Sequence, residues 1–186
     1  MKTWNRTLVS TLLTLVILAF SGAWSTLGAQ EAPPPKPVTL DCAVNASSQL
    51  LGATPVGDGS QSLVLVRIIF GPGGSIGAHT HPGTLTVVVE SGSLGFTLLD
   101  QGEMSITRAA TADSDPVEEP LVQGEETVLN PGDGFIEMGM VHSAANLSDT
   151  DTTVVFAGLV ETGQPVTACV DTASTTSHPM MVSPTD

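Results

Sequence analysis

The sequence has no tyrosine and few cations: five lysines and arginines stand against 19 aspartates and glutamates, for a formal net charge of −14. Two of those cations, Lys2 and Arg6, precede every acidic residue. Without the first 29 residues, three cations remain and the net charge is −16. A surface this negative repels nucleic-acid phosphates and anionic lipids, so we expect no nucleic-acid partner.

Cysteine is equally scarce. Cys42 and Cys169 are the only two, and neither belongs to a C-x-x-C pair or a Cys/His cluster, which argues against a zinc finger or a thiol redox motif. An even pair in an oxidising compartment usually forms a disulfide, here closing a loop worth about 4–5 kcal/mol in the chain-entropy model. The alternative is two buried free thiols.

No apolar run is long enough to cross a bilayer, which takes roughly 20 residues. The run from Leu8 to Phe20 has 13 residues, follows Lys2 and Arg6, and precedes small residues. This pattern predicts a signal peptide over residues 1–29, cleaved after Ala23 or Ala29. We therefore expect an exported protein (periplasmic, cell-surface or secreted) with no stable membrane insertion after cleavage. A proline-rich linker follows over residues 30–38.

Helical periodicity over three turns is also missing. Apolar and β-branched segments recur instead between Gly, Pro, Asn and Asp, which is typical of strands. They predict strands at 62–70, 84–89, 94–99, 104–107, 126–129, 134–138, 141–145 and 152–160. No internal repeat is evident. We predict a single all-β domain over residues 39–171, for which a two-sheet jelly roll is one closed solution.

Two segments lack strand character. Residues 108–126 are acidic, contain two prolines and exceed a usual hairpin connection in length. We predict a solvated, mobile loop there; a lid over the barrel mouth is the alternative. Residues 172–186, rich in Ser and Thr, are expected to be a disordered tail, with His178 a bystander.

Three of the four histidines fall in two short segments. His79 and His81 are two residues apart, and alternate residues of a strand point to the same face. His142, from a distant strand, would complete a set of three neutral nitrogen donors. Such donors suit one divalent transition metal (Fe, Mn, Ni, Cu or Zn), and the sequence does not choose among them.

The residues around these histidines resemble the two motifs of the cupin superfamily. The first motif is matched by Gly73, His79, His81 and Gly92, and the second by Gly139, His142 and Asn146. The resemblance covers roughly residues 63–160. It implies a single type-2-like cupin domain, a double-stranded β-helix or jelly-roll barrel, with a metal held inside the barrel.

The chain departs from the family pattern in its carboxylates. The glutamate of the first motif is missing, because positions 85 and 86 hold Leu85 and Thr86, and Glu137 replaces a proline of the second motif. Glu90 and Glu137 are the candidates for a fourth ligand or for a partner of a ligating imidazole. Regular alternation puts Glu90 on the opposite strand face, unless a bulge near residues 82–83 changes the parity. Some cupin dioxygenases also have three histidines and no carboxylate.

The resemblance implies a metal-dependent dioxygenase- or isomerase-like enzyme acting on a small organic molecule. Two alternatives stay open: a non-catalytic exported module that binds a small ligand or metal, and a structural cupin without bound metal. The sequence identifies no catalytic residue. Since cupins often dimerise, a homodimer is a further expectation.

Overall fold

The computed structural model describes residues 38–171 of the chain. The predicted signal peptide, nearly all of the predicted linker and the predicted tail, with His178, lie outside these residues. None of the described residues belongs to a helix with the length and apolar character needed to cross a membrane.

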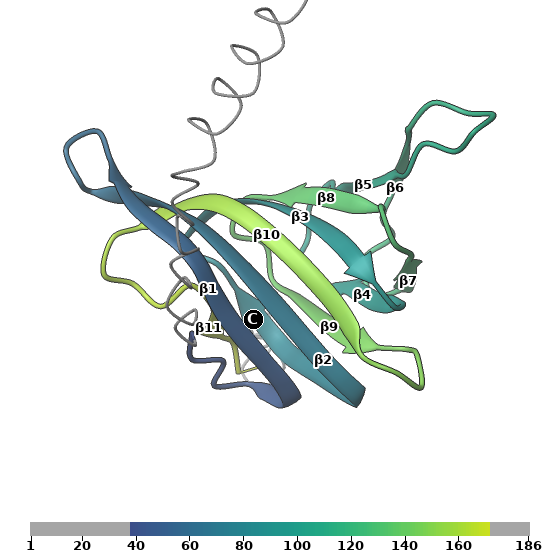
Figure 1. The fold of residues 1–186 in the computed structure, drawn as a ribbon, viewed down its shortest axis with the longest axis horizontal. Coiled ribbons are helices and arrows are strands. Elements are labelled where there is room, and N and C mark those ends of the chain that lie inside the picture. The colour runs from purple at the N-terminus through teal and green to yellow at the C-terminus, as the bar shows by residue number, and fades with distance from the viewer. Residues whose placement is uncertain (1–37, 172–186) are drawn as a thin grey trace, which may run out of the picture. The chain divides into compact units, whose positions relative to one another are not determined.

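The described chain folds into antiparallel β-structure (Figure 1). The strands are β1 (Ala43–Val56), β2 (Gln61–Thr80), β3 (Gly83–Ser91), β4 (Leu94–Leu98), β5 (Ser105–Arg108), β6 (Val117–Pro120), β7 (Glu126–Leu129), β8 (Gly134–Glu137), β9 (His142–Asn146), β10 (Thr152–Glu161) and β11 (Ala168–Cys169). The eight predicted strands are present, each within a few residues of its expected bounds except β2, which runs ten residues further.

The order of hydrogen-bonded strands is β6-β5-β8-β3-β10-β2-β9-β4-β7, with β1 and β11 also paired to β2. Neighbours in this order are rarely consecutive in sequence, as the crossing connections of a jelly roll require. The predicted all-β jelly roll is confirmed.

Strand β2 joins the two sides of the barrel. Its first half pairs with β1 and β10, whereas its second half pairs with β9. The change falls at the sequence Gly71-Pro72-Gly73-Gly74. Gly73 adopts a φ of 70°, and a Cβ at Gly74 would collide with the carbonyl oxygen of Asn45. Glycine is therefore needed where the strand bends toward the histidine end of β2.

The inward-facing side chains form one apolar core. Val66, Leu85, Ile106 and Leu129 are completely buried within it. Alternate residues of β3 and β10 face this core, and their neighbours face outward. Part of this core lines a cavity beside the histidines.

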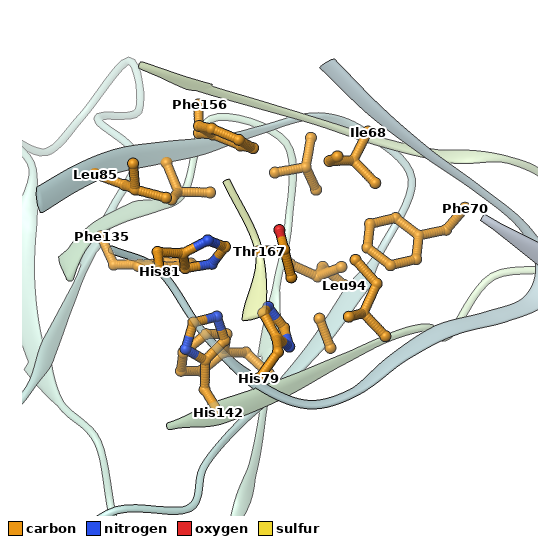
Figure 2. Close-up of a pocket in the computed structure, with 15 residues that line it drawn as sticks. Ile68, Phe70, His79, His81, Leu85, Leu94, Phe135, His142, Phe156 and Thr167 are labelled. Atoms are coloured by element: carbon orange, nitrogen blue, oxygen red, sulfur yellow. The ribbon is translucent and has the colours of Figure 1, made fainter. Parts of the chain in front are cut away.

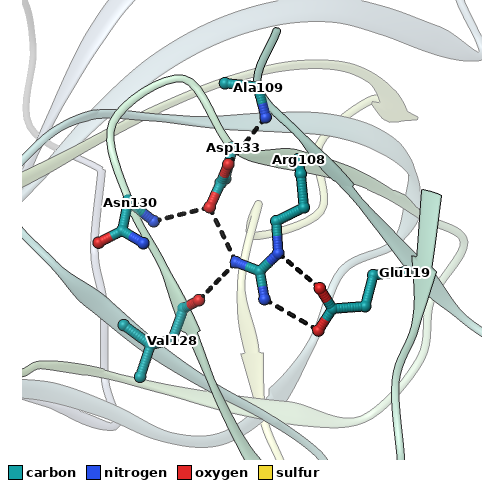
Figure 3. A network of polar contacts seen from close by, with 6 residues as sticks. All are labelled: Arg108, Ala109, Glu119, Val128, Asn130 and Asp133. Carbon is teal, nitrogen blue, oxygen red and sulfur yellow. Dashed lines mark hydrogen bonds and ion pairs between the residues drawn. The ribbon is translucent and has the colours of Figure 1, made fainter. Parts of the chain in front are cut away.

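The acidic segment 108–126 is in part a strand. Its residues Val117–Pro120 form β6, which pairs with β5 as a hairpin. Arg108 makes a two-pronged ion pair with Glu119 across this hairpin, at 2.8 and 2.9 Å, and a second ion pair with Asp133 at 2.9 Å (Figure 3). The composition alone predicts a loop because it does not reveal that Arg108 pairs with Glu119 across a hairpin and with Asp133 beyond the segment.

Cys42 and Cys169 form the predicted disulfide, with their Cα atoms 5.7 Å apart. It joins the residue before β1 to the end of β11. Both β1 and β11 pair with β2, so the disulfide ties two segments to one strand.

Candidate metal centre

The three predicted histidines meet inside the barrel. His79 lies in β2 and pairs across the ladder with His142, the first residue of β9, while His81 directly follows β2. Their side chains are buried, with exposures of 3, 8 and 3 % for His79, His81 and His142. One nitrogen from each ring lies within 4.8 Å of the other two. The spacing of two along β2 and one cross-strand pair thus bring the rings together.

Each imidazole is held by a backbone carbonyl. The Nδ1–H groups of His79, His81 and His142 donate to Gly77, Val166 and Met140, at 2.7, 2.7 and 2.9 Å. A neutral imidazole that donates from Nδ1 keeps an unprotonated Nε2. The three Nε2 lone pairs are therefore free to bind a metal ion, and the three rings lie close together at the cavity (Figure 2).

Burial keeps these histidines uncharged. It lowers the pKa of His81 to about 4, although the hydrogen bond to the Val166 carbonyl acts in the other direction. Burial, together with repulsion from the other two rings, lowers the pKa of His142 to about 3. Burial also lowers the pKa of His79. All three rings are neutral donors at pH 7, which is the form that binds metal.

The histidines line one end of a cavity of about 50 Å³. The rest of its wall is aliphatic and aromatic, including Phe70, Leu85 and Phe156 (Figure 2). Within residues 38–171, Thr167 is the one other polar residue that lines it. Phe96 stacks on the His142 ring with centroids 4.9 Å apart. This apolar surround limits water around the nitrogen atoms and strengthens electrostatic interactions there.

Asn146, from the second motif, has a structural role. Its amide nitrogen donates to the carbonyls of Phe70 and Gly71, at the bend of β2, and its oxygen accepts from the hydroxyls of Ser148 and Thr152. It thereby joins the bend of β2 to the turn between β9 and β10. These bonds fix the two strands that carry His79 and His142.

Glu90 does not face the histidines, so it is not a fourth ligand of a metal bound between them. It lies on the outer face of β3 and forms a two-pronged ion pair with Arg67, at 2.9 and 3.0 Å. Burial alternates regularly from Leu85 to Val89, and the one register shift between β3 and β10 falls at Glu90 itself, which is exposed.

Glu137 supports the loop that precedes His142. It is buried opposite Leu85 on the paired strand β3, and its Oε2 accepts from the N–H groups of Gly139 and Met140, at 2.9 and 3.2 Å. Met140 in turn supplies the carbonyl that holds His142. Burial raises the pKa of Glu137 to about 7, against the effect of these two N–H groups. Glu137 is outside the three-histidine cluster and does not line the cavity.

Two site residues were missed in the sequence, Val166 and Thr167. They follow β10 in a segment with no strand alternation and no motif, and only the folded chain brings them beside His81. Their one sequence signal is their closeness to Cys169, since a disulfide must anchor the chain near it.

The fold and the site define a class, an all-β jelly roll of the cupin type with a buried three-histidine cluster. Solved structures similar to it include the polyketide cyclase RemF from Streptomyces resistomycificus, at 22% identity over 74% of this chain and 80% of that one, with a TM-score of 0.42. A cupin-like protein from Thermotoga maritima matches at 13% identity over 74% and 86%, with a TM-score of 0.41.

Oxalate decarboxylase from Bacillus subtilis matches at 12% identity over 73% of this chain, which spans 29% of that one, with a TM-score of 0.47. No family model and no curated protein matches the sequence. At these identities and TM-scores the matches assign neither a family nor an activity to this chain.

Proposed function

We propose that the protein binds one divalent transition metal ion through the Nε2 atoms of His79, His81 and His142. The observation that supports this is the common arrangement of the rings: each gives its Nδ1–H to a carbonyl and turns Nε2 to the same space. No Nε2 has a hydrogen-bond donor among the described residues. Each Nε2 is an unprotonated acceptor at the cavity, where a cation can bind it.

The donor set fits such an ion. Neutral imidazoles bind Zn, Cu, Fe, Ni or Mn, and the anchoring of each Nδ1–H to a carbonyl is the usual way in which a ligating ring is oriented. A bound ion would supply Lewis acidity and coordination positions open to a small ligand. The chain's own part is to fix the three rings, to keep them unprotonated and to exclude water with the apolar wall.

We propose that this site belongs to an exported protein, in the periplasm, at the cell surface or in the medium. The Cys42–Cys169 disulfide supports an oxidising compartment, and the predicted signal peptide supports export. The acidic composition supports a small-molecule partner in preference to nucleic acid.

Metal analysis of protein purified without an affinity tag tests the site. We expect about one metal ion per wild-type chain, and little in a His81→Ala variant that keeps its circular dichroism spectrum. His178→Ala is the matched control and should keep the wild-type metal content. Equal metal in wild type and His81→Ala would overturn the proposal.

A second candidate function is a metal-dependent oxidoreductase or isomerase of a small organic molecule. The cavity beside the three Nε2 atoms favours it, because a ligand there would lie against the ion. Among the described residues, no carboxyl or amino group lines the cavity wall, which favours a binding role without catalysis.

Oxygen uptake by iron-loaded protein would support the enzyme, whereas ligand-dependent stabilisation without turnover would support the binding module. Metal-free protein without a ligand response would support a structural role.

A further inference from the structure

All three methionines of residues 38–171 line one hollow at the protein surface. The hollow lies beside β5 and β8 and shares no lining residue with the histidine cavity. Its lining includes Met104, Met138, Met140, Glu103 and Glu118. The fold therefore brings the methionines together, although Met104 is distant from the other two in the sequence.

The turn after β8 directs two of the methionines to the same hollow. Met138 continues the outward alternation of β8 beyond Ile136 and is 74 % exposed. Gly139 follows with a φ of 78°, a left-handed conformation that ends the alternation, and Met140 then lines the hollow as well. The carboxylate of Glu137 holds this turn, because it accepts from the N–H groups of Gly139 and Met140.

Met104 reaches the hollow from the segment before β5. It is buried, and its carbonyl accepts from the N–H group of Leu121 at 2.8 Å. The Met140 side chain lies directly against this segment, since a Cβ at Gly102 would be 2.6 Å from the Met140 methyl carbon. One buried and two more accessible thioether side chains thus share a hollow that solvent reaches.

The chemistry of these side chains selects one class of ligand. A thioether sulfur is a soft, uncharged donor, which suits monovalent copper and not the hard cations Ca²⁺ or Mg²⁺. Both cysteines are in the disulfide, so within residues 38–171 the methionines supply the remaining sulfur donors. Glu103 and Glu118 line the same hollow and offer negative charge to a cation.

We propose that Met104, Met138 and Met140 form a binding site for one Cu⁺ ion, with Glu103 and Glu118 attracting the ion. The site is separate from the three histidines and does not rest on the metal site proposed there. A thioether carries no acidic proton, so these ligands release none when the ion binds.

Nuclear magnetic resonance of full-length protein labelled with ¹³C in the methionine methyl groups tests the site. During titration with Cu⁺ kept reduced by ascorbate, we expect the signals of Met104, Met138 and Met140 to shift together and to saturate at about one equivalent. Single substitutions by leucine assign the signals. Met180 and Met181, outside the described residues, are internal controls and should shift less. Shifts confined to these two, or no shifts, would overturn the proposal.

Competition with a chromogenic Cu⁺ chelator measures the affinity of the hollow. All three histidines are replaced by Asn in this experiment, so that the histidine cluster does not compete for the ion. Met138→Leu and Met140→Leu should each weaken binding at least about tenfold, because each nearly keeps the side-chain volume but removes one of three ligands. Met180→Leu is the matched control and should keep the affinity.

The zinc content of protein that retains its histidines separates this site from the proposed function. Met138→Leu should leave the zinc content unchanged, because Met138 does not line the histidine cavity. Wild-type Cu⁺ affinity in both Met138→Leu and Met140→Leu would overturn the methionine site and leave the histidine site standing. Protein that binds Cu⁺ in the hollow but no zinc would support the methionine site and overturn only the histidine site.

Discussion

Three carbonyl oxygens determine what the histidines can do. Gly77, Val166 and Met140 each take the Nδ1 proton of one ring, which fixes the tautomer and leaves Nε2 for the cavity. His79 and His142 donate this bond to the carbonyl of a residue two positions earlier in the chain, so the local backbone orients both rings. His81 depends on Val166, 85 residues away.

The same burial that keeps the rings neutral makes the metal-free fold sensitive to acid. The histidine pKa values are lowered on folding, to about 4 for His81 and about 3 for His142. The unfolded chain, with histidine pKa values near about 6.5, then binds more protons than the folded chain below that pH. Stability should therefore fall as the pH drops from about 6.5 toward 4.

Glu137 has the opposite effect on the pH dependence of stability, because it favours the folded state as the pH falls. Its pKa is raised to about 7 in the fold, so between its ordinary value and 7 the folded state holds the extra proton. Three histidines outweigh one glutamate, and the net direction is loss of stability in acid. Urea unfolding of metal-free protein at pH 7 and pH 5 checks this, and we expect a lower midpoint at pH 5. The variant in which all three histidines are replaced by Asn should lose this fall in the midpoint and keep only the opposite effect of Glu137. An unchanged midpoint in wild type would contradict the prediction.

At the scale of strands, apolar alternation was a good guide. It identified β2, β3, β8 and β10, whose buried residues alternate with exposed ones. It missed β1, which is mostly exposed, carries a non-glycine residue with positive φ at Asn45, and shifts register twice along β2. An outer strand without a buried face has no reason to alternate. Strand β11 has two residues, too few for any pattern.

The disulfide links two distant segments at the site, and its removal should affect both stability and metal binding. A double Cys42→Ala, Cys169→Ala variant loses a cross-link between residues 127 positions apart. The expected loss is about 4–5 kcal/mol in the chain-entropy model. Metal affinity should also fall, about tenfold, because Val166 orients His81 from the released segment.

Denaturant unfolding and competition with a chromogenic chelator measure the two effects. Gln61→Ala, an exposed residue at the start of β2, is the control for an unrelated substitution. A double variant with lowered stability but wild-type zinc affinity would show that the segment holds its place without the cross-link.

The three-histidine cluster was predictable from the sequence, whereas the residues that surround it were not. His79 and His81 followed from strand alternation, and His142 from the motif around it. The outward face of Glu90 also followed from alternation, although its ion pair with Arg67 did not. The sequence did not predict that Val166 and Thr167 lie near the histidines, because their position depends on the pairing of β11 with β2. Pairings between distant segments leave little trace in one sequence.

Over the whole molecule, charge is the dominant property. The chain beyond residue 29 carries 19 acidic and three basic residues, and both arginines of the described domain are in ion pairs with acidic side chains. The remaining carboxylates therefore set a negative potential around the barrel. Such a potential concentrates cations near the surface and raises their rate of arrival at a buried site.

Metal association should consequently slow as salt is added. Stopped-flow mixing of metal-free protein with Co²⁺ measures the rate, and between about 10 mM and 0.5 M NaCl the screening length falls from roughly 30 Å to below 10 Å. We expect the association rate constant to fall by about tenfold over this range. The dissociation rate should change little, because it depends on the three imidazoles inside the apolar cavity, where salt does not reach. Sucrose solutions of matched viscosity control for the slower diffusion of the ions. An association rate constant that does not depend on salt would show that the acidic surface serves solubility alone.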